Sequence, residues 1–160
     1  MKHNLQFRSK TQADDAWITA ISTKLWGSPE IISRDDTYDL LKIPNFIAVY
    51  DRSPVGFIMY VEKGKTCEIV ALYCKITNQG IGTKLIDRVK DIAKKDGCSK
   101  AWLMTTNDNT AALCFYQKRG FVITGIRTNV IEEQRKIKPI PMLGNDGIPI
   151  RDEIELEIEL

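Results

Sequence analysis

The stretch Thr77–Thr83, TNQGIGT, joins a strand-like run to an amphipathic helix. The run before it, Thr66–Ile76, is rich in β-branched and apolar residues, and Ile81–Asp96 carries apolar residues at helical spacing. Gly80 and Gly82 let the backbone approach a ligand and present its N–H groups to it. Since the positive end of the helix faces the same place, the sequence predicts an anion site that suits a pyrophosphate.

Two other phosphate-binding turns do not match this stretch. A Walker A loop needs G-x-x-x-x-G-K-[ST], but Gly82 is followed by Thr83 and only then by Lys84. A dinucleotide-binding turn needs G-x-G-x-x-G, and Leu85 stands where its third glycine belongs. Taken alone, the pair Gly80 and Gly82 also fits a tight strand-to-helix connection that binds nothing.

The rest of the pattern predicts an α/β fold. Three runs joined by short turns, as in Asp51–Pro54, indicate an antiparallel meander. The expected helices are Thr11–Gly27, Asp35–Leu41, Ile81–Asp96, Asn109–Arg119 and Val130–Arg135. The expected strands are Phe46–Tyr50, Val55–Glu62, Thr66–Ile76, Ala101–Thr105, Phe121–Ile126 and Arg151–Leu160.

The chain has 160 residues and a formal net charge of +2. That length fits one domain over residues 1–160, and the near balance of charge gives no reason to expect nucleic-acid or membrane binding. No run reaches the ~18 apolar residues of a membrane span, and Met1–Leu5 has no signal-peptide pattern. The four cysteines form no C-x-x-C pair and His3 is the only histidine, so we expect no metal site and a cytoplasmic protein with reduced thiols.

A second motif lies at Asn109–Phe121, NTAALCFYQKRGF. It resembles the N-x-x-A-x-x-x-Y-x-x-x-G-F signature of the general N-acetyltransferase (GNAT) superfamily, and it follows the glycine turn by one helix and one strand, as in that family. The turn itself resembles the family's acyl-CoA motif, [QR]-x-x-G-x-[GA], with Thr77 in the place of the usual Gln or Arg. The resemblance implies the family's fold: a mixed, mostly antiparallel sheet with a splayed central strand and flanking helices.

The resemblance also implies acetyl-CoA as the cosubstrate. In the family, the strand before the glycine turn exposes backbone groups that hold the cofactor, and here these groups would belong to Leu72, Tyr73 and Cys74. Asn109 would hydrogen-bond the pantetheine arm and Ala112 would pack against it, although Asn109 equally fits a plain helix N-cap. The residues whose backbone would hold the pyrophosphate are Gln79, Gly80, Ile81, Gly82 and Thr83.

Two residues are candidates for the chemistry. Tyr116 matches the family tyrosine that lies near the sulfur and acts as general acid; the other interpretation is a core aromatic. Cys67–Val70, CEIV, resembles the segment of the histone acetyltransferase branch in which a strand glutamate is the base, which makes Glu68 the candidate base. The alternatives for Glu68 are a surface glutamate, a substrate contact, or a site that uses only ordered water.

The expected activity is transfer of an acetyl group from acetyl-CoA to a primary amine of a small molecule or protein. A non-catalytic acyl-CoA-binding or sensing domain of the same fold is the alternative. The strand Arg151–Leu160 could lie at a sheet edge and pair with a second subunit in a homodimer. Core packing is expected of Trp17, Trp26 and Tyr38, and Lys75, Lys84 and Arg88 are either solvated charges or contacts of the coenzyme A phosphates.

Overall fold

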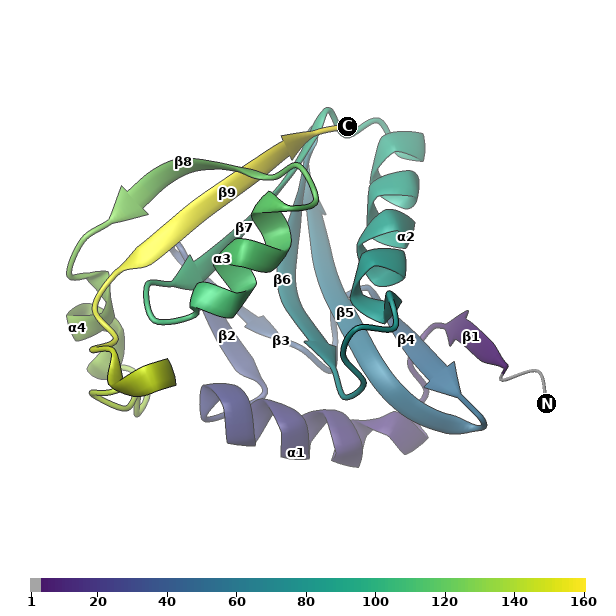
Figure 1. Cartoon of the computed structure of the whole chain (residues 1–160), viewed down its shortest axis with the longest axis horizontal. Coiled ribbons are helices and arrows are strands. Elements are labelled where there is room, and N and C mark those ends of the chain that lie inside the picture. The colour runs from purple at the N-terminus through teal and green to yellow at the C-terminus, as the bar shows by residue number, and fades with distance from the viewer. Residues whose placement is uncertain (1–3) are drawn as a thin grey trace. The chain divides into compact units, whose positions relative to one another are not determined.

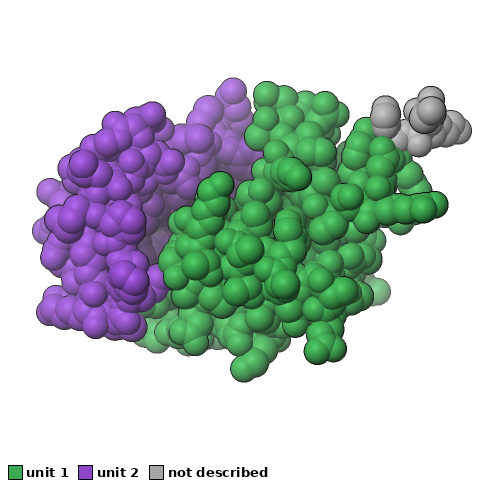
Figure 2. Space-filling view, turned by 90° about the horizontal axis from the view of Figure 1, so that it is seen from below, with its two compact units in different colours: residues 1–101, 160 green, residues 102–159 purple. Residues whose placement is uncertain are grey.

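The computed structural model describes residues 4–160 and divides them into two compact units. The first unit runs to Ala101 and includes Leu160, and the second is Trp102–Glu159; Figure 2 colours them separately. Residues 1–3, on which the expectation about a signal peptide partly rests, lie outside the described residues. No helix within residues 4–160 is long and apolar enough to cross a membrane.

The first unit is built on an antiparallel sheet whose strands follow the order β1-β4-β5-β6 (Figure 1). The expected meander is therefore confirmed. The elements of the unit are β1 (Leu5–Arg8), the 3-10 turn η1 (Gln12–Asp14), α1 (Asp15–Trp26), β2 (Glu30–Ser33), β3 (Asp36–Asp39), β4 (Asn45–Tyr50), β5 (Ser53–Lys63), β6 (Thr66–Cys74) and α2 (Ile81–Lys95).

Helices α1 and α2 cover opposite faces of these strands. Ile18 of α1 belongs to a core cluster with Phe57 of β5. At Gly56, the residue of β5 just before Phe57, an added Cβ would lie 3.5 Å from the side chain of Ile81, at the start of α2. Because neighbouring residues of a strand point to opposite faces, α1 and α2 lie on different sides of the sheet.

One expectation for the first half of the chain is wrong, and β1 was missed. Residues 35–41 do not form a helix, because β2 and β3 pair as a hairpin that joins Ser33 to Asp36 through a two-residue turn. Arg34 takes a φ of +52° in that turn. The strand β1, which pairs with β4, was not expected at all.

A β-bulge in β6 decides which way Glu68 points. Met59 of β5 lies opposite Ala71, and a regular ladder would then place Val61 opposite Ile69. Val61 instead lies opposite Glu68, so β6 carries one extra residue between these pairs. Glu68 therefore shares the face of Ala71, which is the face that packs against α1.

The second unit places its strands in the order β7-β9-β8. The final strand lies between two others, so the expectation that Arg151–Leu160 is an edge is wrong; β8 is the edge strand. The short helix expected at Val130–Arg135 is present. The elements of this unit are β7 (Lys100–Thr106, whose first two residues belong to the first unit), α3 (Thr110–Gln117), β8 (Val122–Arg127), α4 (Val130–Arg135), the 3-10 turn η2 (Asn145–Gly147) and β9 (Glu153–Glu159).

The residue-level pairings within each unit are antiparallel. Helices flank the strands in both units. This confirms the α/β class and the mostly antiparallel sheet. A splayed central strand stays a prediction from the family resemblance.

Candidate functional site

The glycine turn ends in a helix start with open backbone donors. Gly80 is the N-cap of α2 with a φ of +71°, which favours glycine, and no side chain caps this end. Lys84 N–H donates to Gly80 O at 3.0 Å as the first helical hydrogen bond of α2. The N–H groups of Ile81 and Gly82 precede that bond and point out of the helix start, as an anion site requires.

The end of β6 runs into this turn and stays hydrogen-bonded to β5. Phe57 lies opposite Tyr73 and Gly56 opposite Cys74. A Cβ at Gly56 would come within 2.8 Å of the Tyr73 carbonyl oxygen, so glycine permits the close approach of the two strands. Burial raises the pKa of the Cys74 thiol to about 11 and so keeps the thiol protonated. The predicted contact of Cys74 with the cofactor is accordingly through its backbone.

Glu68 is a buried carboxylate with two hydroxyl donors. Glu68 is only 4% exposed. The Ser33 hydroxyl donates to its Oε1, and the Tyr38 hydroxyl donates to its Oε2 at 3.1 Å. Burial raises the pKa of this carboxyl, while the hydrogen bonds from Ser33 and Tyr38 oppose that rise. A carboxyl with a raised pKa in a fixed position has the properties of a general base near neutral pH.

The hairpin β2–β3 supplies both hydroxyls, and the sequence did not reveal them. Ser33 and Tyr38 are separated from Glu68 by 35 and 30 residues. Tyr38 is largely buried, as expected of a packing residue, but its hydroxyl also serves Glu68. No sequence signal links these residues, because their meeting depends on the hairpin and on the bulge.

Asn109 caps α3 in the second unit. Its Oδ1 accepts the Ala112 N–H at 3.2 Å, so the capping interpretation is confirmed. This bond leaves the two hydrogens of the Asn109 amide for another acceptor.

Tyr116 is 8% exposed in the second unit, with its ring 5.5 Å from that of Phe121. The end of the motif explains this packing. Gly120 adopts a φ of +91°, and the Phe121 N–H then donates to Tyr116 O at 3.2 Å. The G-F pair of the signature thus fixes Tyr116 at the end of its helix.

Asn107 and Asp108, which precede the Asn109 cap, bind the segment around residues 145–151 through hydrogen bonds. Asn107 Oδ1 accepts the Arg151 N–H at 3.0 Å, and Asp108 Oδ2 accepts the Asn145 N–H at 3.0 Å. A Cβ at Gly144 would lie 2.0 Å from Asp108 Oδ2, so glycine is required there. These bonds hold the start of α3, and no sequence pattern predicted them.

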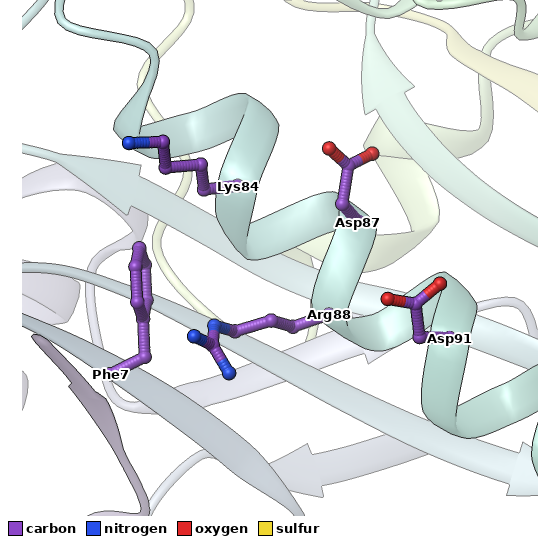
Figure 3. Close-up of a pocket in the computed structure, with 5 residues that line it drawn as sticks. All are labelled: Phe7, Lys84, Asp87, Arg88 and Asp91. Carbon is purple, nitrogen blue, oxygen red and sulfur yellow. The ribbon is translucent and has the colours of Figure 1, made fainter.

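The basic residues after the glycine turn lie in mixed surroundings. Lys84 and Arg88 line a surface pocket of about 300 Å³ with Phe7, Asp87 and Asp91. Figure 3 shows Arg88 reaching toward the Phe7 ring, and the guanidinium carbon lies 4.3 Å from the ring centroid. Two acidic residues offset the two cations here, which favours the interpretation of solvated helix charge.

The predicted site residues fall into two groups. The first unit holds Glu68, the strand end Leu72–Cys74 and the turn Gln79–Thr83 on two consecutive elements. The second unit holds Asn109, Ala112 and Tyr116 on one helix and its cap. Each group has the local structure that the motifs require.

Comparison with known proteins identifies a family and several similar proteins. The family model described as Acetyltransferase (GNAT) family matches residues 16–121. An uncharacterised protein of Bacillus subtilis, YdhI, is 40% identical over 139 residues, which cover 86% of this chain and 87% of that protein. The peptidyl-lysine N-acetyltransferase YjaB of Salmonella typhimurium is 32% identical over 109 residues, 66% of each chain. A GNAT family acetyltransferase of Elizabethkingia anophelis, solved with acetyl-CoA bound, is 28% identical with a TM-score of 0.74 over 98% of this chain and 99% of its own.

Proposed function

The chain belongs to the acetyltransferase (GNAT) family and is an acyltransferase with acetyl-CoA as its cosubstrate, and on that premise we propose that it acetylates a primary amine by direct attack in a ternary complex. The observation that carries the proposal is the uncapped start of α2 at Gly80, next to the end of β6. The chain is therefore an enzyme, and not the non-catalytic acyl-CoA-sensing domain that was the alternative. The acceptor is an amine of a small molecule or of a protein, and the likeness to a peptidyl-lysine N-acetyltransferase supports the second class.

The backbone of the first unit would hold the cofactor. The N–H groups from Gln79 to Thr83 would bind the pyrophosphate, with the helix dipole adding to the attraction. Backbone groups of Leu72–Cys74 would bind the pantetheine arm and the thioester carbonyl. From the second unit, the Asn109 amide would donate to the pantetheine and Ala112 would pack against it. We accordingly propose that both units work as one acetyltransferase domain over residues 1–160, since the family match spans parts of both.

The reaction needs a base and an acid. An alkylamine has a pKa of about 10.4, so it arrives mostly protonated and must lose a proton before its nitrogen can attack. Glu68 would take this proton directly or through a water molecule, because each of its oxygens has a second lone pair beyond the one used by Ser33 or Tyr38. As the C–N bond forms and the C–S bond breaks, Tyr116 would give its proton to the leaving thiolate.

The proposal extends to the setting of the enzyme. Cys67, Cys74, Cys98 and Cys114 are free thiols, which supports a cytoplasmic location. A homodimer also remains a proposal, to be measured by gel filtration. No nucleic acid or membrane is part of the proposed reaction.

A screen of acceptors tests the function. Purified protein is mixed with acetyl-CoA and with polyamines, amino acids, aminoglycosides or lysine-containing peptides, and release of the coenzyme A thiol is followed. At least one amine should raise thiol release well above the hydrolysis seen without acceptor, with the acetylated amine found by mass spectrometry. Binding of acetyl-CoA without transfer to any amine in these classes would contradict the proposed reaction.

A further inference from the structure

A base at the position of Glu68 needs a way to pass its proton to water. The residue is only 4% exposed, and Ser33 and Tyr38 stand against its two oxygens. Direct exchange with solvent is therefore hindered on the sides of the carboxylate that these two hydroxyls cover. After each turnover the proton taken from the amine must leave Glu68 before the next amine can be deprotonated.

The Tyr38 hydroxyl lies between two carboxylates. It is 3.1 Å from Glu68 Oε2 on its buried side and 3.4 Å from Asp36 Oδ2 on its outer side. The Asp36 side chain is half exposed and forms an ion pair with Lys63 at 2.5 Å. A buried carboxylate, a hydroxyl and a solvent-facing carboxylate thus form a continuous chain within the first unit.

We propose that Tyr38 is the proton outlet of Glu68, a positioning residue that links the buried carboxylate to Asp36 at the surface. This proposal rests on the proposed function, because it takes Glu68 as the base. While Glu68 is ionised, the Tyr38 hydroxyl donates to it. Once Glu68 is protonated, its O–H donates to the Tyr38 oxygen and the Tyr38 O–H turns to Asp36.

The transfer is a balanced relay. The proton of Glu68 moves to the Tyr38 oxygen as the proton of Tyr38 moves to Asp36, which then releases it to water. Tyr38 ends as it began, Glu68 is again a carboxylate, and no electrons change hands. The hydrogen bond from Lys63 holds the pKa of Asp36 below its usual range, so Asp36 gives the proton up to water readily.

Ser33 provides the matched comparison. Its hydroxyl donates to the other oxygen of Glu68, and Ser33 is buried, as Tyr38 is. Its hydroxyl donates to Glu68 and not outward to a surface acidic residue. Loss of either hydroxyl removes a donor to the carboxylate and should raise the pKa of Glu68, but only loss of Tyr38 should break the relay.

Other charges around Glu68 belong to the same hairpin and to the strands beside it. Arg34 and Lys63 lower the pKa of Glu68 by their positive charge, and Cys67 is a neighbouring thiol whose pKa burial raises to about 12. Neither cation is altered in the variants below. A change in the behaviour of Glu68 can then be assigned to the hydroxyl that was removed.

Two measurements on the full chain test the outlet. The first is the pKa of Glu68, followed by NMR of protein labelled with ¹³C at the glutamate carboxyls. The second is kcat against pH, with an acceptor from the screen. Tyr38→Phe and Ser33→Ala should both raise the pKa of Glu68 and move the acidic limb of kcat to higher pH. Tyr60→Phe, a buried tyrosine with no bond to Glu68, should match the parent in both.

The plateau above the acidic limb separates the two hydroxyls. There Glu68 is ionised in every variant, so Ser33→Ala should recover the parental kcat while Tyr38→Phe stays roughly tenfold or more below it. Asp36→Asn, which leaves both donors to Glu68 in place, should lower the plateau without raising the pKa of Glu68. Equal plateaus for Tyr38→Phe and Ser33→Ala would overturn the outlet.

Failure of this inference differs from failure of the proposed function. If Glu68→Gln retains the parental kcat with an active acceptor, Glu68 is not the base and the proposed mechanism fails with the outlet. If Glu68→Gln loses activity but Tyr38→Phe and Asp36→Asn keep the full plateau, only the outlet is wrong.

Discussion

Glu68 lies directly opposite Val61 in the β5–β6 ladder, one position away from where a regular ladder would place it. The single extra residue in β6 turns the Glu68 carboxylate to the face where Ser33 and Tyr38 meet it. Without the bulge, Ile69 would lie at that point and the carboxylate would face the side of α2. One inserted residue therefore places a candidate base.

Replacement of the base should separate chemistry from binding. In Glu68→Gln, turnover should fall by about 10²- to 10⁴-fold, the usual contribution of a proton-transfer group, while the affinity for acetyl-CoA changes little. Glu62→Gln is the control, because Glu62 pairs with Cys67 on the opposite face of the same two strands. Steady-state kinetics and calorimetry on both variants check this, and an unchanged pH–rate profile in Glu68→Gln would reject the base.

Two substitutions at Asn109 distinguish its cap from its proposed contact with pantetheine. Asn109→Asp keeps an oxygen for the Ala112 N–H but loses the amide donor, so the protein should stay stable and bind acetyl-CoA more weakly. Asn109→Ala should lose both, with about 1 kcal/mol of stability lost along with the cap. Thermal unfolding and calorimetry measure the two effects, and parental affinity in Asn109→Asp would limit Asn109 to capping.

Removal of the Tyr116 hydroxyl should slow release of the thiolate. Because the ring packs edge-on against Phe121, Tyr116→Phe should fold normally. We expect turnover about 10²-fold lower, with acetyl-CoA binding retained. A thiol-release assay at several pH values measures this, and full activity of Tyr116→Phe would leave Tyr116 as a core aromatic only.

The stability of the first unit should depend on pH through Asp14. Arg8 holds this carboxylate with two bonds, at 2.6 and 2.9 Å, and so lowers its pKa from 3.8 to about 2. The folded-state pKa is depressed, so the contribution is present above pH 3.8 and is lost as the pH falls through about 2. Asp14→Asn should therefore destabilise the protein by about 2 kcal/mol at neutral pH, and by much less near pH 2.

Urea unfolding of the parent and of Asp14→Asn across this pH range gives the comparison. Asp15→Asn is the control, since Asp15 pairs with Lys10 and its side chain is 34% exposed. A constant difference between Asp14→Asn and the parent at all pH values would show that charge on Asp14 is not the cause.

The parts of the site that depend on local sequence were predictable. The N-cap at Gly80, the cap at Asn109 and the helix that carries Tyr116 follow from glycine conformation, capping and apolar spacing over a few residues. The meander was predictable for the same reason, because the composition of Asp51–Pro54 is typical of a turn. In the structure Asp51 and Arg52 form a two-residue hairpin turn with positive φ at both positions.

The parts that depend on tertiary contacts were not predictable. The segment at Asp35–Leu41 has a composition that permits a helix, but pairing with β2 and the bond from Tyr38 to Glu68 favour a strand. The four residues of β1 are too few to show a strand pattern, and they form a strand because they pair with β4. The bulge in β6 leaves no mark in the sequence either.

The most direct test of the proposed cofactor site, which lies at the glycine turn, is calorimetry with acetyl-CoA. The parent is compared with Gly82→Trp, whose bulk fills the turn, and with Lys95→Trp, which adds the same ring at the exposed far end of the same helix. We predict micromolar binding by the parent and by Lys95→Trp, and no binding by Gly82→Trp protein that circular dichroism shows to be folded. Equal binding by all three proteins, or no binding by the parent, would contradict it.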